Sequence, residues 1–131
     1  MEAEIIDEPG ALAERMGITI AEAAPERIVG SMPVDGNTQP YGMLHGGASC
    51  VLAETLGSIG AAMYAYRLFA GRAVGVDINA THHRAAREGT VTGVATPLRL
   101  GRTVVTYEIV ITDDGGKRVC TARLTCVLLR S

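Results

Sequence analysis

The sequence contains no tryptophan and a single phenylalanine, and aromatic residues make up only 4% of its 131 positions. Proteins that hold single-stranded nucleic acids stack bases on aromatic side chains, so this composition argues against that class. A net charge of -2 argues equally against binding to a phosphate backbone. The 47% of hydrophobic residues must instead build a core mainly of alanine, valine, leucine and isoleucine.

Cysteine is scarce as well. Cys50, Cys120 and Cys126 are odd in number and show no C-x-x-C spacing, which argues against a disulfide framework and a zinc site. The first residues are acidic where a secretory signal would be basic, so we expect no signal peptide and a cytoplasmic location.

Positive charge is carried almost entirely by arginine and is unevenly placed. Residues 1–35 have a charge balance of -6, and the remaining residues have +4. Arg84, Arg87, Arg99 and Arg102 lie within nineteen positions of one another. They could bind a small anionic ligand, or they could be solvated arginines at strand ends.

Hydrophobic periodicity predicts one α+β domain over residues 1–131, with no linker or repeat. The predicted elements are a short helix at 11–16, strands at 18–24 and 27–33, a turn-rich loop at 34–42, a helix at about 48–69, and strands at 73–81, 89–100, 102–112 and 117–129. A curved antiparallel sheet wrapped around the one long apolar helix is the economical packing. In the last two strands, the residues expected to face the core are Val105, Tyr107, Ile109 and Ile111, then Cys120, Ala122, Leu124, Cys126 and Leu128.

The long helix contains a single acid, Glu54, among apolar neighbours. Burying an unpaired carboxylate is costly, so Glu54 is either a solvated residue at the helix edge or a catalytic base or nucleophile facing a cleft. Glu54 and the interrupting Gly57 and Gly60 argue against a membrane span.

His45, Gly46 and Gly47 precede this helix. Free amides at a helix N-terminus, with the helix dipole, can polarise a carbonyl whose oxygen becomes negative during acyl transfer. A plain turn is the alternative.

The distance between these groups predicts a dimer. Gly46 and Glu54 are eight residues apart, or about 12 Å along a helix, whereas groups acting on one carbonyl must each approach to about 3 Å. If both act on one substrate, Gly46 of one subunit must meet Glu54 of another, with two helices antiparallel across a two-fold axis.

Five segments closely resemble hotdog-fold acyl-CoA thioesterases: Met32-Pro-Val-Asp, Thr38-Gln-Pro-Tyr-Gly-Met-Leu-His-Gly-Gly-Ala-Ser, Leu52-Ala-Glu-Thr-Leu-Gly-Ser, Val74-Gly-Val-Asp-Ile-Asn-Ala-Thr-His and Ala86-Arg-Glu-Gly. Within this family, the chain looks like the branch of phenylacetate-pathway, 4-hydroxybenzoyl-CoA and 1,4-dihydroxy-2-naphthoyl-CoA thioesterases. These names would link it to phenylacetic acid degradation or to menaquinone biosynthesis. Glutamate at position 54, where other relatives carry aspartate, supports this grouping.

The resemblance implies a role for each matched residue. Glu54 would be the nucleophile or general base and the Gly46 amide the oxyanion donor, while Gln39 and His45 position the thioester and Ser58 orients the water or the acid. The residues implied for binding of substrate and coenzyme A are Gly47, His82, Arg84, Arg102 and Arg99.

The function implied is hydrolysis of an acyl-CoA, with an aromatic acyl group preferred. No metal or redox cofactor is expected, and coenzyme A enters as part of the substrate. The implied assembly is a homodimer with composite sites, forming a dimer of dimers, without nucleic-acid or membrane partners. Two alternatives are a hotdog dehydratase or hydratase and a non-catalytic acyl-CoA-binding or proofreading accessory protein.

Overall fold

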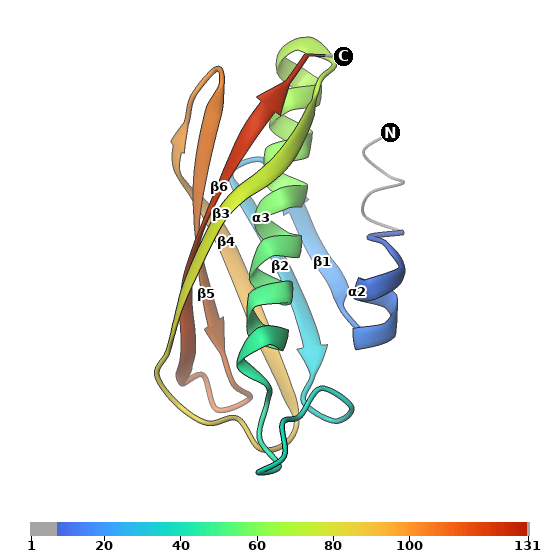
Figure 1. Ribbon diagram of the computed structural model, residues 1–131, viewed down its shortest axis with the longest axis vertical. Helices are drawn as coiled ribbons and strands as arrows, with labels where there is room; N and C mark the ends of the chain where they lie inside the picture. The colour runs from blue at the N-terminus through green and yellow to red at the C-terminus, as the bar shows by residue number, and fades with distance from the viewer. Residues whose placement is uncertain (1–7, 131) are drawn as a thin grey trace.

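A computed structural model describes residues 8–130 of the chain (Figure 1). The elements, in order, are α2 (Ala11–Met16), β1 (Thr19–Ala24), β2 (Arg27–Pro33), α3 (Gly46–Phe69), β3 (Arg72–His82), β4 (Thr90–Leu100), β5 (Val104–Thr112) and β6 (Arg118–Leu129). Every predicted helix and strand is present, with most boundaries within two residues of those expected from the sequence.

The strands form one six-stranded antiparallel sheet in the order β1-β2-β4-β5-β6-β3. The chain crosses from β2 through α3 to β3 at the opposite edge and then returns to β4. α3 lies along one face of the curved sheet (Figure 1). The prediction of an antiparallel sheet wrapped around one helix is therefore confirmed.

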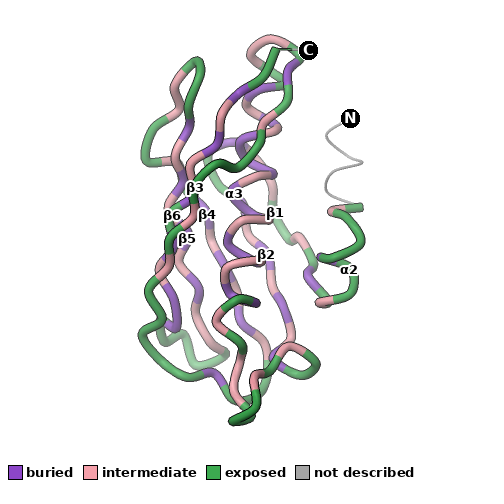
Figure 2. Tube along the Cα trace, in the orientation of Figure 1, coloured by how far each residue is buried: buried purple, intermediate pink, exposed green. Residues whose placement is uncertain are grey.

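Alternation along β5 and β6 places one side of each strand against α3. All nine core-facing residues predicted in these two strands are buried, and Tyr107 is the largest of them. Figure 2 shows the buried residues recurring along the strands and the inner side of α3. Tyr107 donates a hydrogen bond to the Pro25 carbonyl, so its polar end is satisfied inside the core.

Glycines let α3 lie close to the sheet. A β-carbon added at Gly60 would lie 2.5 Å from Ile28 and 2.7 Å from the Tyr107 ring.

α3 is long and apolar enough to cross a membrane by length and composition, but 61% of its most apolar 18-residue window is buried in the structure. This is the pattern of a core helix, in agreement with the sequence-based argument against a membrane span.

β3 forms one outer edge of the sheet and carries a bulge. Its register with β6 shifts between Gly75 and Asp77, which leaves Val76 without a partner residue. Val74 and Val76 are 47% and 58% exposed.

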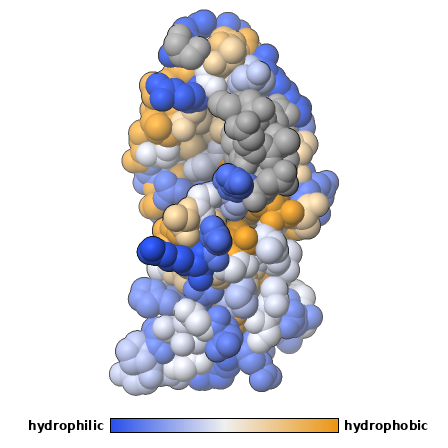
Figure 3. Space-filling view, turned by 90° about the vertical axis from the view of Figure 1, so that its right-hand side faces the viewer, coloured by the Kyte–Doolittle hydropathy of each residue, from blue (hydrophilic) through white to orange (hydrophobic). Residues whose placement is uncertain are grey.

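In the space-filling view, apolar surface gathers toward the upper part of the molecule, whereas the lower end is mainly hydrophilic (Figure 3). The N-terminus of α3 lies at that lower end (Figure 1).

Candidate active site

The first turn of α3 has one amide available for a ligand. His45 is the N-cap, and its Nδ1 accepts a hydrogen bond from the Gly47 amide at 2.8 Å. The His45 carbonyl accepts from the amides of Ala48 and Ser49. Within residues 8–130, the Gly46 amide has no acceptor. Gly46 N–H is therefore the donor of this turn that can bind an incoming carbonyl oxygen.

A pocket of about 420 Å³ opens in front of this turn. It brings together five polar or glycine positions predicted from the sequence or next to them, namely Gln39, Gly46, His82, His83 and Arg84. The His82 ring packs directly on Gly46, since a β-carbon added there would lie 2.9 Å from His82 Nε2. Ser49, a buried polar residue with no distinct signal in the sequence, also lines this pocket.

Gln39 belongs to a tight loop beside the pocket. Its backbone amide donates to the Met43 carbonyl, and its carbonyl accepts from the Gly42 amide. Its side-chain oxygen accepts a short hydrogen bond from the Tyr41 amide. The side-chain NH₂ has no acceptor in the described part of the chain and so remains available as a donor toward a ligand.

Glu54 lies in a second pocket of about 460 Å³. Besides Glu54, this pocket is lined by Ser58, by the mainly apolar set Thr55, Ile59, Ala62 and Ala73, and by residues 8–10. Glu54 is half-buried, and no described residue forms a hydrogen bond or ion pair with its carboxylate. Gly46 and Glu54 thus open into different pockets of one subunit, as their spacing along the helix predicts.

Two thiols lie near Glu54. Burial, and then the charge of Glu54, raise the pKa of Cys50. Burial, and then the same charge, raise the pKa of Cys126 to about 11. A hydrogen bond from the Ser58 hydroxyl lowers this pKa, but by less than burial and Glu54 raise it. At neutral pH both groups are therefore neutral thiols. Ser58 lies one helical turn after Glu54, and its hydroxyl is held by Cys126 of β6, a contact that the sequence did not indicate.

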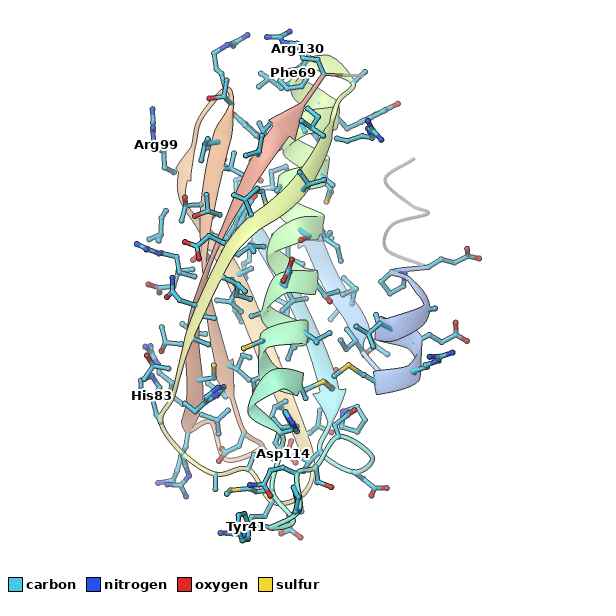
Figure 4. All side chains as sticks on the ribbon, in the orientation of Figure 1. Tyr41, Phe69, His83, Arg99, Asp114 and Arg130 are labelled. Carbon is cyan, nitrogen blue, oxygen red and sulfur yellow. The ribbon has the colours of Figure 1, made fainter. Side chains whose placement is uncertain are left out.

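The predicted binding arginines are not brought together within one chain. Arg84 Nε lies 3.5 Å from Asp113 Oδ2, and both residues are near the end that holds the Gly46 pocket. Arg99 and Arg102 lie at the other end of β4, which is about 33 Å long at about 3.3 Å per residue. Figure 4 shows Arg99 and Arg130 toward one end and Tyr41, His83 and Asp114 toward the other. Within a single subunit, Arg84 and Arg87 therefore line one pocket, whereas Arg99 and Arg102 lie away from them.

Residues 8–130 contain no group of three histidine, cysteine or acidic side chains that could hold a metal ion.

Three contacts of the site lacked a sequence signal: Ser58 with Cys126, Arg84 with Asp113, and His82 with Gly46. Gly75 of β3, which lies against the Glu54 carboxylate, was also missed. A glycine inside a strand often marks a close approach, so this residue did carry a weak signal.

Comparison with known proteins identifies the family and the fold of the chain. The thioesterase superfamily profile matches residues 41–120. The proofreading thioesterase EntH of Cronobacter sakazakii is 46% identical over 121 residues, which cover 92% of this chain and 87% of that protein. A solved structure of a mutant thioesterase from Pseudomonas aeruginosa is 38% identical with a TM-score of 0.89, covering 98% of this chain and 92% of that one.

A solved mutant of a Staphylococcus aureus protein, with a glutamate changed to alanine, is 32% identical with a TM-score of 0.84. The match covers 91% of this chain and 98% of that one. The family match, the close relative and the shared architecture of one helix on a six-stranded sheet all agree, and the chain belongs to the thioesterase superfamily with its hotdog fold.

Proposed function

We propose that this enzyme hydrolyses acyl-CoA thioesters to a free acid and coenzyme A. The observation that carries the proposal is that the chain holds both a helix amide, Gly46 N–H, and a half-buried carboxylate, Glu54, neither of which has a hydrogen-bond or ion-pair partner among residues 8–130. An acyl transfer to water requires both an oxyanion donor and a base or nucleophile. The S. aureus protein provides support, because a second solved mutant of it has a glutamine changed to alanine. The substituted glutamine and glutamate of that protein lie fifteen positions apart, the same separation as Gln39 and Glu54.

The reaction proceeds in one of two ways. Glu54 either removes a proton from the water that attacks the thioester carbon, or attacks that carbon itself to give an anhydride that water then opens. In both routes the carbon–sulfur bond breaks, and the sulfur leaves with a proton as the thiol of coenzyme A. Gly46 N–H stabilises the oxyanion in both routes, Gln39 and His45 position the thioester, and Ser58 orients the water or the acid.

The separation of the two pockets supports a composite site in a homodimer. Within residues 8–130, β3 is an outer strand of the sheet, paired on one side only, and it carries the exposed residues Val74 and Val76. Antiparallel pairing of two such edges about a two-fold axis would continue the sheet and set two α3 helices side by side. Gly46 of one subunit would then serve the pocket of Glu54 in the other. A dimer of dimers is the assembly implied by the family resemblance.

The two pockets differ in the charge of their lining residues, with Arg84 in one and Glu54 in the other, which supports a division of the substrate between them. Arg84 and His82, which line the Gly46 pocket, would bind the phosphates and pantetheine end of coenzyme A together with Gly47 of the first turn of α3, since arginine is well suited to phosphate. Arg99 and Arg102 could reach the same nucleotide only from another subunit. The Glu54 pocket, with Ile59, Ala62 and Ala73, would take an apolar acyl group, for which an aromatic acid is our preferred class.

A second function is favoured by the name of one relative. The Cronobacter protein is called a proofreading thioesterase, so this chain could release wrongly loaded acyl groups rather than serve one degradation or menaquinone route. A dehydratase or hydratase would pair a catalytic histidine with the acid, whereas no residue of 8–130 is hydrogen-bonded to the Glu54 carboxylate. An accessory protein that only binds acyl-CoA would not need a half-buried acid. We place the reaction in the cytoplasm, with no cofactor besides the coenzyme A of the substrate.

Thiol release from benzoyl-, phenylacetyl-, dihydroxynaphthoyl- and fatty-acyl-CoA tests the proposal. Turnover should be measurable and favour an aryl substrate, and Glu54→Ala should nearly abolish it while leaving coenzyme A binding intact. Glu54→Gln is the matched variant, because it keeps the shape of the side chain and removes the charge. Either variant retaining more than about a tenth of wild-type kcat would contradict the mechanism.

The composite site has its own test. Position 50 is midway between 46 and 54, so a two-fold axis that joins those positions passes near Cys50 of both subunits. A short bismaleimide should link two wild-type chains and should not link Cys50→Ala. Full activity in a monomer obtained by dilution would refute the composite site.

A further inference from the structure

The carboxylate of Glu54 lies against the backbone of β3 at Gly75. A β-carbon added at Gly75 would be 2.7 Å from Glu54 Oε2 and 3.5 Å from Glu54 Cδ. Contacts between a β-carbon and an oxygen are not tolerated below about 3 Å, so any side chain at this position would displace the carboxylate. The site at which Glu54 rests is thus formed by the absence of a side chain.

The bulge in β3 occurs at this place. Gly75 is paired with Cys126 of β6, and the register shifts immediately afterwards at the unpaired Val76. Cys126, the cross-strand partner, holds the hydroxyl of Ser58. One pair of strand residues, Gly75 and Cys126, therefore contacts one pair of helix residues a turn apart, Glu54 and Ser58.

We propose that Gly75 is a positioning residue for catalysis, which sets the place of the Glu54 carboxylate by leaving room for it on β3. The proposal rests on the proposed function through the role of Glu54. The overlapping atom is the far end of a flexible side chain. A larger residue would therefore move the carboxylate and leave the strand in place, and displacements of about 1 Å at a reacting group can cost about 10²-fold in rate.

Gly75→Ala tests the proposal through kcat and KM for the best acyl-CoA. We expect kcat to fall by tenfold or more on the scale set by misplaced catalytic groups, with KM changed less than kcat. Gly115→Ala is the matched control, because its added carbon would lie at an ordinary 3.4 Å from Asp113 Oδ1 in an exposed turn, and it should keep wild-type kcat. A Gly75→Ala enzyme with wild-type kcat would overturn the proposal.

Shortening the acid supplies a second measurement. In a Glu54→Asp enzyme the carboxylate is withdrawn by one methylene, so Gly75→Ala should cost much less there than in the wild type. An equal loss in both backgrounds would mean that Gly75 acts on the strand and not on the carboxylate, which contradicts the proposal.

Folding gives a readout independent of activity. If Gly75→Ala does not fold, the same substitution in a Glu54→Ala chain decides the matter, because the overlapping oxygens are then gone. That double variant should fold with the Tm of Glu54→Ala, and failure to fold in both backgrounds would overturn the proposal. An absence of thioester hydrolysis by the wild-type protein would instead refute the proposed function, and the folding comparison would still test the contact.

Discussion

The Nδ1 atom of His45 accepts a hydrogen bond from the Gly47 amide, 2.8 Å away, so one of the two glycine amides at the start of α3 is already hydrogen-bonded. This hydrogen bond fixes the proton of the neutral ring on Nε2 and leaves Gly46 N–H as the free donor. His45 therefore has two separable properties: it caps the helix, and it carries an Nε2–H group that can donate to a substrate.

Changing His45 should separate stability from activity. His45→Ala removes the cap and should lower the free energy of unfolding by about 1 kcal/mol, a typical cost for a lost N-cap. His45→Asn supplies a preferred cap and should restore that stability, but it lacks the imidazole, so kcat should stay low. Urea unfolding and thiol-release kinetics on both variants check this. Recovery of kcat with asparagine would show that capping is the only role of His45.

Gly46→Ala should damage the oxyanion donor through His82. The added β-carbon would lie 2.9 Å from His82 Nε2, so either the ring or the first turn of α3 must shift. We expect a loss in kcat on the order of 10²-fold, comparable with loss of one oxyanion donor. Combining the change with His82→Ala removes the overlap, and Gly46→Ala should then cost less than in the wild type. Additive losses in this double-mutant cycle would argue against the contact.

The ion pair between Arg84 and Asp113 leads us to expect that changing either residue alters the KM for acyl-CoA. Arg84→Ala should raise KM for acyl-CoA and leave hydrolysis of a short thioester without the nucleotide nearly unchanged. Asp113 also accepts hydrogen bonds from the Gly115 and Lys117 amides. Asp113→Asn can keep those bonds and lose the ion pair, so it should give a smaller rise in KM. Equal losses on both substrates would remove Arg84 from the nucleotide site.

Arg102→Ala distinguishes a nucleotide site shared between subunits from a nucleotide site formed within one subunit. Arg102 lies beyond the far end of β4, so it can influence KM only if another subunit brings it to the nucleotide. A rise in KM for acyl-CoA alone would therefore support a shared nucleotide site. An unchanged KM would leave coenzyme A to Arg84 and its neighbours, and would count against the binding role that the family resemblance implies for Arg102.

Alkaline pH should destabilise the fold through two buried thiols. Burial raises the pKa of Cys120 and of Cys126 from 9.0 to about 11. The unfolded chain therefore loses these protons first, so their stabilising contribution is complete below pH 9 and is lost as the pH rises from 9 to 11. Urea unfolding across that range should show a steeper decline for the wild type than for Cys120→Ala. Parallel curves would contradict the assignment to Cys120.

The fold could be predicted closely because its signals are local. In β5 and β6 a strict alternation identifies the core face, and all nine residues named from it are buried. The start of α3 and Glu54 could be predicted for the same reason, since two glycines before a helix and one acid within it are visible without knowledge of the tertiary structure.

The rest of the site depends on contacts between distant segments. Gly75 meets Glu54 only because the chain crosses to the far edge of the sheet after α3 and pairs β3 with β6. The Arg84 to Asp113 pair likewise joins two loops that become neighbours at one end of the sheet. Closeness in sequence does not place Arg99 and Arg102 beside Arg84. A strand as long as β4 separates them, so residues that are near in sequence lie at opposite ends of the molecule.

The placement of Gly46 and Glu54 in separate pockets has a genetic consequence. In a composite dimer, each chain lends its amide to one site and its carboxylate to the other. A chain inactivated at Gly46 and a chain inactivated at Glu54 would then repair each other when mixed, because their heterodimer contains one site with both defects and one site with none. Random exchange of subunits would restore about a quarter of the sites, so two dead alleles expressed together would complement.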